Sequence, residues 1–340
     1  MPSASPIIDM HAHILAEDTI EILRRETPSV APQLSEITAE GARLEVAGVH
    51  QNPFPRGAWD LERRLADMAR CGFDMQVLAV CPQTLMYDQE PALALTVAQI
   101  QNEQIAALCR AMPERFLGLA TAPMQAPERA AEELRRAVRE LGLRGVMIGS
   151  SINGTNLDDP ALEPFWQAAA DTGAFVLIHP IKPTAGERTK GYYLKNLIGN
   201  PLETTIAAAS LVFGGVLERH PSLKICLSHG GGFAPYQFGR FIHGWRERPE
   251  ARLHLGETSP AASLDRLLYD TILHHPEPLA YLVSMAGPGR VMLGSDYPFD
   301  MGMYDGVSVV KGLPVGEDAI GQILSGTAQK LLVTKAGAAA

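Results

Sequence analysis

Short apolar runs alternate along the chain with longer segments in which apolar residues recur every three or four positions. The runs at 75–80, 175–178 and 224–227 are typical of buried strands. The segments at 60–71 and 127–141 each carry a single apolar face, which predicts amphipathic helices. Strands that are apolar along their whole length and alternate with helices predict a parallel sheet covered by helices.

About eight such strand–helix units can be counted, which predicts an α/β protein of the (β/α)8 or TIM-barrel type. The expected strands lie at 7–14, 75–80, 116–120, 144–148, 175–178, 224–227, 264–270 and 290–293, of which 264–270 has the least clear pattern. A helix at 204–218 is nearly all apolar, and a last helix is expected near 317–333. A doubly wound open sheet is the structural alternative, but neither of its glycine-rich phosphate motifs, G-x-G-x-x-G or G-x-x-x-x-G-K-[ST], occurs.

We expect one domain over residues 1–335, since barrels of this kind commonly have such a length. The segment 16–58 looks irregular, apart from a short helix at 19–25 and a short strand at 44–49. The prolines and the glycine at 52–57 predict a loop. Because long structureless connections are uncommon in compact domains, we interpret 16–58 as a functional insertion near the active-site mouth.

Charge and composition exclude several classes of protein. With 29 Lys and Arg against 38 Asp and Glu, the net charge of −9 argues against a nucleic-acid surface. The four cysteines are scattered, so neither a disulfide framework nor a zinc finger is indicated. The N-terminus lacks a signal core, and no apolar stretch approaches the ~20 residues of a membrane span. We therefore expect a cytoplasmic protein with no membrane partner.

Residues with ionisable side chains recur at the carboxyl ends of the expected strands. His11 and His13 are two positions apart on the first strand and so point to the same side. His179, His229 and Asp296 each follow a later strand. An isolated His-x-His is more often a pair of satisfied core histidines. Five such residues at the one rim where barrel enzymes keep their active sites favour a metal site.

The donor set favours particular ions. Imidazoles and a carboxylate without thiolates suit Zn²⁺, with Mn²⁺, Fe²⁺ or Co²⁺ as possible alternatives. His11, His13, His179 and Asp296 would provide four ligands and leave room for a water. His229 is then either a further ligand or a general acid/base outside the coordination shell. A divalent ion lowers the pKa of bound water toward ~7, so a nucleophilic hydroxide is available at neutral pH.

Several motifs resemble the amidohydrolase superfamily: Met-His-Ala-His at 10–13, His-Gly-Gly-Gly at 229–232 and Leu-Gly-Ser-Asp-Tyr-Pro-Phe at 293–299. Together with segments 199–205, 214–218 and 238–244, they resemble the branch of 2-amino-3-carboxymuconate-6-semialdehyde decarboxylase and related non-oxidative decarboxylases. The resemblance implies one zinc ion held by His11, His13, His179 and Asp296. It further implies that His229 stands outside the coordination shell and moves the proton of the metal-bound water.

Two arginines are assigned by the same resemblance. Arg240, eleven residues after His229, matches the arginine that reaches the partner subunit's substrate carboxylate, which implies a homodimer. Arg56 corresponds to the carboxylate-binding arginine of the same subunit, although it lies one residue closer to the tryptophan than in the family. Tyr192 and Asn196 stand where the family has tryptophans, so the substrate can differ from that of the founding enzyme.

The sequence therefore predicts a zinc-dependent decarboxylase of an unsaturated or aromatic carboxylic acid, with His229, Asp296, Arg240 and Arg56 in the active site. The alternative is a metal-dependent hydrolase of a lactone, C–C or amide bond that uses the same site. A metal-binding scaffold without turnover is disfavoured, because the set of ligand-type residues is complete.

Overall fold

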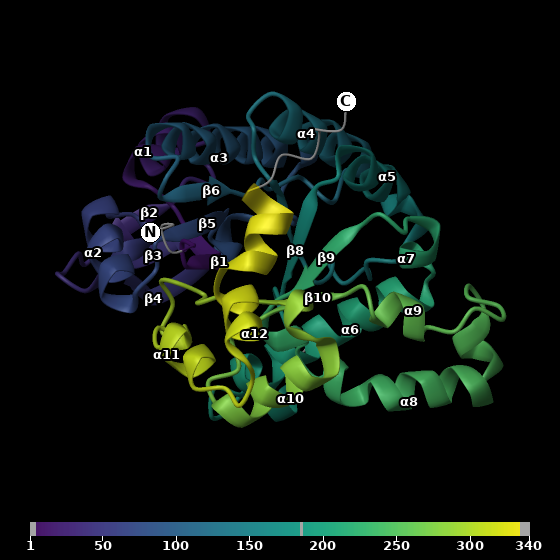
Figure 1. Ribbon diagram of the computed structural model, residues 1–340. Helices are drawn as coiled ribbons and strands as arrows, with labels where there is room; N and C mark the ends of the chain where they lie inside the picture. Colours follow the sequence, from purple (N-terminus) through teal and green to yellow (C-terminus); the bar gives the residue numbers. More distant parts are fainter. Residues whose placement is uncertain (1–4, 184–185, 334–340) are drawn as a thin grey trace, which may run out of the picture.

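Eight parallel strands form the centre of the molecule in the computed structural model, which describes residues 5–183 and 186–333 (Figure 1). They are β1 (Ile8–Ile14), β5 (Met75–Val80), β6 (Phe116–Gly118), β7 (Gly145–Gly149), β8 (Phe175–His179), β9 (Lys224–Leu227), β10 (Leu268–Asp270) and β11 (Val291–Met292). The ladders run in the orders β1-β5-β6 and β7-β8-β9-β10-β11. Each strand therefore lies beside the next strand of the barrel in the sequence.

Backbone hydrogen bonds connect these two sheets on both sides. Between β6 and β7, the Met147 N–H donates to the Ala120 carbonyl at 2.9 Å. Between the end of β11 and β1, the Met10 N–H donates to the Leu293 carbonyl at 2.8 Å. The strands thus follow one another around a ring, and the expected (β/α)8 barrel is confirmed.

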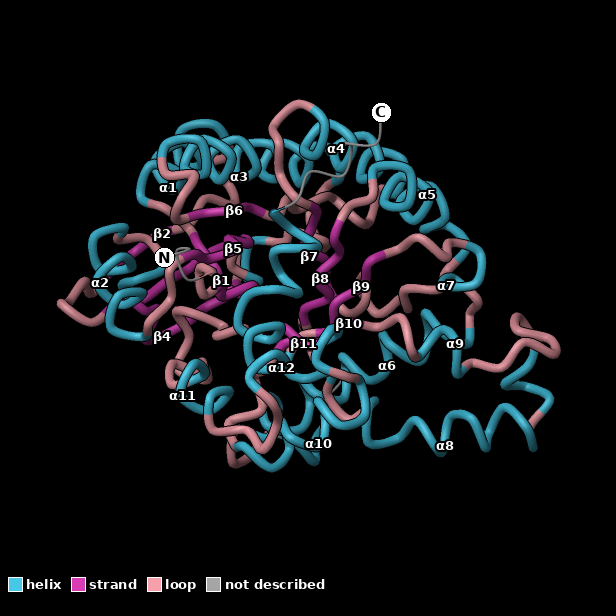
Figure 2. Tube along the Cα trace, in the orientation of Figure 1, coloured by secondary structure: helices cyan, strands magenta, loops and turns pink. Residues whose placement is uncertain are grey.

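Helices surround the strands, as the tube in Figure 2 shows. They are α2 (Leu61–Cys71), α3 (Pro91–Ala111), α4 (Pro127–Arg139), α5 (Glu163–Thr172), α6 (Asn200–Phe213), α7 (Val216–Arg219), α8 (Ala234–Glu247), α9 (Ala261–Leu264), α10 (Pro276–Ala286), α11 (Gly306–Lys311) and α12 (Glu317–Gly321). Asp60 caps α2, because its Oδ1 accepts from the Arg63 N–H at 3.0 Å. No helix in the described part of the chain combines the length and apolar composition needed to cross a bilayer.

The expected helix over 204–218 is instead two helices. Helix α6 ends at Phe213, and α7 begins at Val216. Between them, Gly215 adopts a left-handed φ of 72°, which an L side chain accommodates poorly. The all-apolar composition concealed this break, because the pattern continues across the two glycines.

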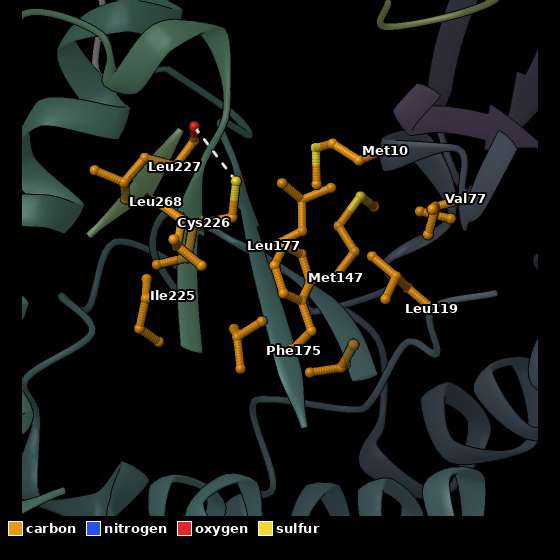
Figure 3. Packing of buried hydrophobic residues seen from close by; sticks show 14 of the residues in the cluster. Met10, Val77, Leu119, Met147, Phe175, Leu177, Ile225, Cys226, Leu227 and Leu268 are labelled. Carbon is orange, nitrogen blue, oxygen red and sulfur yellow. Dashed lines mark hydrogen bonds between the residues drawn. The ribbon is translucent and has the colours of Figure 1, made fainter. Parts of the chain in front are cut away.

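The interior of the barrel is filled by apolar side chains from many strands. Met10, Met147, Leu177 and Cys226 are each fully buried. Figure 3 shows these side chains directed toward a common interior. The barrel is therefore a packed core and not a pore, so a ligand has access only at one end.

The insertion at 16–58 is more ordered than the sequence indicates. Helix α1 (Glu17–Glu26) is followed by an antiparallel sheet of β2 (Gln33–Ser35), β3 (Gly41–Val46) and β4 (Val49–Pro55). The predicted strand at 44–49 is wrong in part: residues 44–46 belong to β3, but Ala47 and Gly48 form the turn between β3 and β4 with φ of 48° and 79°. The predicted loop at 52–57 is also wrong in part. Proline lacks an N–H, but an edge strand such as β4 tolerates it.

Candidate metal centre

A cavity of about 980 Å³ opens at the carboxyl ends of the barrel strands. Its floor includes His179, His229 and Asp296, three of the residues singled out in the sequence. Part of its wall comes from the insertion, through residues 49–53 of β4. Residues of the segment 16–58 therefore border the cavity.

Four of the predicted residues converge beneath this cavity. His11 and His13 come from β1, His179 ends β8, and Asp296 follows β11. One potential ligand atom from each lies within 4.8 Å of the others, and all four residues are buried. Asp296 Oδ1 lies 3.0 Å from His13 Nε2 and 3.5 Å from His11 Nε2. It lies 3.7 Å from His179 Nε2.

In each of the three histidines, Nδ1, the ring nitrogen that faces away from Asp296, has a hydrogen-bond partner. Nδ1 of His11 lies 2.8 Å from Asp270 Oδ2, and Nδ1 of His13 lies 2.9 Å from the Val80 carbonyl. Nδ1 of His179 lies 2.9 Å from the Pro180 carbonyl. Because these acceptors take the Nδ1 proton, the Nε2 lone pairs are left to face one another.

The site fits a divalent ion. His179 Nε2 is buried and has no hydrogen-bond partner, which would be costly unless another group accepts its lone pair. His11 Nε2 and His13 Nε2 face each other at 3.0 Å. Three imidazole nitrogens and one carboxylate oxygen directed at a common point form the kind of donor set that Zn²⁺ and related ions bind.

The pKa values of His13, His179 and Asp296 agree with such a site, whereas at His11 the lowering effect of burial is outweighed by Asp270 and Asp296, which raise the pKa. Burial lowers the pKa of His13 and lowers that of His179 to about 3, so both rings are neutral ligands. Burial alone would raise the pKa of Asp296, but the neighbouring side chains of His13, His179 and His229 hold it well below its ordinary value. Asp296 is therefore a carboxylate. A neutral imidazole and an ionised carboxylate are the forms that bind metal.

Asp270 in β10 is a site residue that the sequence did not reveal. Besides accepting from His11 Nδ1, it accepts the backbone N–H of His229 at 2.9 Å and that of Gly230 at 2.8 Å. Burial alone would raise its pKa, but the hydrogen bond with His11 and the proximity of His11 and His229 lower the pKa. One carboxylate thus orients both the His11 ring and the loop that carries His229.

A second buried network supports the opposite side of the site. Asp9 accepts from Ser295 Oγ at 2.6 Å and from Gln76 Nε2 at 2.9 Å. Arg64, also buried, donates to Gln76 Oε1 at 2.9 Å and to the backbone carbonyl of His13. Burial raises the pKa of Asp9 to about 6. The network fixes the backbone on both sides of the ion site, at β1 and at the segment before Asp296.

His229 lies beside the four ligands and faces the cavity. Its Nε2 is 3.4 Å from Asp296 Oδ2, and its side chain is 16% exposed. The glycines after it are sterically required, since a Cβ on Gly232 would lie 2.1 Å from the Pro201 carbonyl. His229 can therefore exchange protons with a molecule in the cavity.

The structure does not bring the two predicted arginines to the cavity of this chain. Arg56 Nε is bound to Asp60 Oδ2 at 2.7 Å, and Nη1 donates to the Thr38 carbonyl. Arg240 is exposed on α8. Neither side chain is among the residues that line the cavity.

Sequence comparison identifies the family. The profile of the family described as Amidohydrolase matches residues 8–333. The chain belongs to the amidohydrolase family. This amidohydrolase is 37% identical over 295 residues to 2-amino-3-carboxymuconate-6-semialdehyde decarboxylase of Dictyostelium discoideum, covering 87% of this chain and 82% of that one.

Solved structures show the same fold. 5-Carboxyvanillate decarboxylase from Sphingomonas paucimobilis superposes with a TM-score of 0.82 at 24% identity, covering 98% of this chain and 100% of that one. Dihydroxybenzoic acid decarboxylase from Polaromonas sp. JS666, solved with bound manganese and the inhibitor 2-nitroresorcinol, superposes with a TM-score of 0.77 at 21% identity. It covers 96% of this chain and 97% of that one. This amidohydrolase therefore shares the fold of these two decarboxylases.

Proposed function

We propose that this amidohydrolase is a metal-dependent, non-oxidative decarboxylase of an unsaturated or aromatic carboxylic acid. The observation that carries the proposal is the convergence of three histidine Nε2 atoms and Asp296 Oδ1 beneath the cavity, with His229 beside them. The 37% identity to a decarboxylase over most of both chains supports this choice of reaction.

His11, His13, His179 and Asp296 would hold the ion, and zinc is the metal we propose. Manganese is the main alternative, because a decarboxylase of the same fold contains it. When bound, a divalent ion supplies Lewis-acid stabilisation of developing negative charge and activates water. Three neutral imidazoles and one carboxylate leave the site with a net positive charge that attracts a carboxylate.

His229 would handle the proton of the reaction. Loss of carbon dioxide breaks a C–C bond and leaves the bonding electrons on carbon, so this carbon must receive a proton. His229 faces the cavity, and Asp296 Oδ2 and the Asp270-bound backbone hold its ring in place. A positioned histidine of this kind typically accelerates proton transfer about 10²- to 10⁴-fold.

The second candidate is hydrolysis of a lactone, C–C or amide bond at the same centre. It is favoured by the position of His229 beside the candidate ligands, because an ion held there and His229 would together direct a water at a carbonyl. The two reactions differ in whether a hydrogen from solvent replaces a carboxylate on carbon. Only decarboxylation places a solvent-derived hydrogen on the carbon that carried the carboxylate.

The decisive experiment incubates the zinc- or manganese-loaded protein in D₂O with hydroxylated benzoic acids, muconate semialdehydes and lactones. We expect carbon dioxide release from at least one acid, with deuterium at the vacated carbon of the product. Chelation should abolish release, and the added metal should restore it. Turnover of the lactones without any carbon dioxide would overturn the proposal in favour of the hydrolase.

His229→Asn tests the role of the histidine. We expect a loss of activity of about 10²-fold or more with metal content unchanged, because His229 is a proton carrier and not a ligand in this proposal. His275→Asn is the matched control, since His275 is 65% exposed, pairs with Glu277 and does not line the cavity. Loss of the metal in His229→Asn would contradict the assignment.

A further inference from the structure

One wall of the cavity comes from a segment with few ties to the rest of the molecule. Residues 186–198 lie between β8 and α6, and Tyr193, Asn196 and Leu197 among them line the cavity. No residue of this segment is buried. Apart from the helical hydrogen bonds that lead into α6, its hydrogen bonds and ion pairs with described residues all stay within the segment. The rest of the fold therefore holds 186–198 only weakly.

A second wall segment, which follows β5, is firmly anchored. Its Tyr87 is buried, and the Tyr87 hydroxyl accepts the Gly149 N–H at 3.1 Å. The Tyr87 carbonyl accepts from Asn153 Nδ2 at 2.5 Å, and the Met86 carbonyl accepts from Gln125 Nε2 at 2.9 Å. The wall of the cavity thus combines a fixed side with a side that few contacts hold.

The backbone of 186–198 is strained at two adjacent residues. Tyr192 and Tyr193 have φ of 57° and 61°, in the left-handed region that residues with large side chains rarely adopt. Such conformations are stable where the surrounding structure enforces them. Because few contacts hold this segment, relief of the strain favours a rearrangement about these two residues.

The segment also exposes apolar side chains at the mouth of the cavity. Tyr192 and Tyr193 are 91% and 56% exposed, and Leu197 and Ile198 are 49% and 42% exposed. Removal of such surface from water is favourable, so an arrangement that brings these side chains over an occupied cavity gains stability. The cavity, at about 980 Å³, is at the upper end of the ~300–1,000 Å³ range of small-molecule pockets and has room for them.

We propose that residues 186–198 form a lid that closes over the cavity when a ligand occupies it. Closing turns the chain about Tyr192 and Tyr193, whose φ angles leave the left-handed region, and places apolar side chains between the ligand and solvent. A closed lid excludes water from the reacting groups, and it must reopen before product leaves. The inference holds for a decarboxylase and for a hydrolase alike, because it concerns access to the cavity and not the bond that breaks.

Limited trypsin digestion of the metal-loaded protein tests the lid. Calorimetric titration first identifies which of benzoate, salicylate and trans,trans-muconate binds. At saturation, this ligand should slow cleavage after Lys190, in the middle of the segment, about tenfold, because the closed lid opens less often to the protease. Cleavage after Arg252 is the control and should be unchanged, since Arg252 does not line the cavity.

Two substitutions at Tyr192 test the hinge. Tyr192→Gly and Tyr192→Ala remove the same exposed ring, but only glycine adopts the left-handed conformation without strain. Glycine should therefore favour the open lid, and the ligand should bind about fivefold more weakly to Tyr192→Gly than to Tyr192→Ala. Glu36→Gly and Glu36→Ala are the matched controls, since Glu36 also has a left-handed φ of 51° but does not line the cavity. These two variants should bind the ligand equally.

Three results would overturn the lid. The first is an unchanged rate of cleavage after Lys190 with the ligand bound, and the second is equal affinity of the two Tyr192 variants. The third is a loaded protein that binds none of the three acids, because the lid would then have no ligand to close over. Carbon dioxide release is measured separately, so failure of the lid leaves the decarboxylase standing, and hydrolase activity would leave the lid standing.

Discussion

Asp270 contacts both His11 and the backbone of His229. Its carboxylate orients the His11 ring from behind and also accepts the N–H groups of His229 and Gly230. A carboxylate behind a metal-binding histidine fixes the tautomer and increases the basicity of the nitrogen that faces the ion. The orientation of the His11 ring and the position of the His229 backbone therefore depend on the same side chain.

Asp270→Asn should weaken metal binding by about 10- to 100-fold, because an amide cannot supply the negative charge opposite His11. Competition with a chelating dye measures the dissociation constant of the ion. Asp265→Asn is the control, since Asp265 is 73% exposed and pairs only loosely with Arg290 at 3.5 Å. Equal affinities in the Asp270→Asn variant and the native protein would show that His11 is oriented by its packing alone.

At the level of single residues, the sequence predicts the ligands but not their support. His179 and Asp296 are recognisable because each follows a clear apolar strand, and parallel strand ends meet at one rim. Asp270 ends β10, the strand with the least clear pattern, and so carries no comparable signal. Arg56 lies four residues before Asp60, a spacing that itself favours the observed ion pair over a role in the site.

Helix α2 is tied to the segment that carries Asp296. Tyr297 Oη donates to Asp67 Oδ2 at 2.9 Å, while Arg63 and Arg70 each pair with Asp67 at 3.0 Å. Burial would raise the pKa of Asp67, but the hydrogen bonds from Arg70, Tyr297 and Arg63 outweigh it and lower the pKa. This side chain is 12% exposed, so the interactions are only partly screened by water.

Asp67→Asn should lower the free energy of unfolding by about 1 kcal/mol at pH 7. Because the folded-state pKa of Asp67 lies below its ordinary value of 3.8, its carboxylate stabilises the fold above that value. This stability is lost as the pH falls through the lowered pKa, so variant and native protein should converge in acid. Urea unfolding from pH 7 to pH 3 measures the difference, with Glu62→Gln on the exposed face of α2 as control.

Elements with a regular pattern are predictable, and those that depend on tertiary partners are not. The strand at 75–80 is observed with its predicted bounds because every residue in it is buried. In β4, by contrast, Pro53 and Pro55 give a loop signal, and only its edge position beside β3 makes a strand possible. Such pairing information is absent from local sequence.

A second copy of the chain would account for several exposed apolar side chains. Phe233, Tyr236 and Tyr281 are 41%, 77% and 45% exposed, and the rings of Tyr236 and Tyr281 lie 6.1 Å apart. They surround the N-terminal end of α8, the helix along one outer edge of the molecule in Figure 1. Exposed apolar clusters of this kind mark interaction sites. We propose that this face forms a homodimer and that Arg240 reaches the partner's cavity.

Hybrid dimers test whether Arg240 acts across subunits. Arg240→Ala and His229→Ala should each be inactive alone, yet a purified hybrid of the two should recover about half of the native activity. In the hybrid, one cavity combines an intact His229 with the arginine of the other subunit. A hybrid without activity would place Arg240 in its own subunit's site. A single species with the mass of one chain in light scattering would exclude the dimer altogether.

Part of the cavity wall is encoded by a stretch of the chain that carries no candidate ligand. The candidate ligands are in β1, at the end of β8 and after β11, whereas β4 contributes to the wall without supplying any of them. Mutations in this stretch can therefore change which acid is accepted while the chemistry is preserved. Selection can diversify substrates in such a family one loop at a time, and a transplanted wall would be expected to carry its specificity with it.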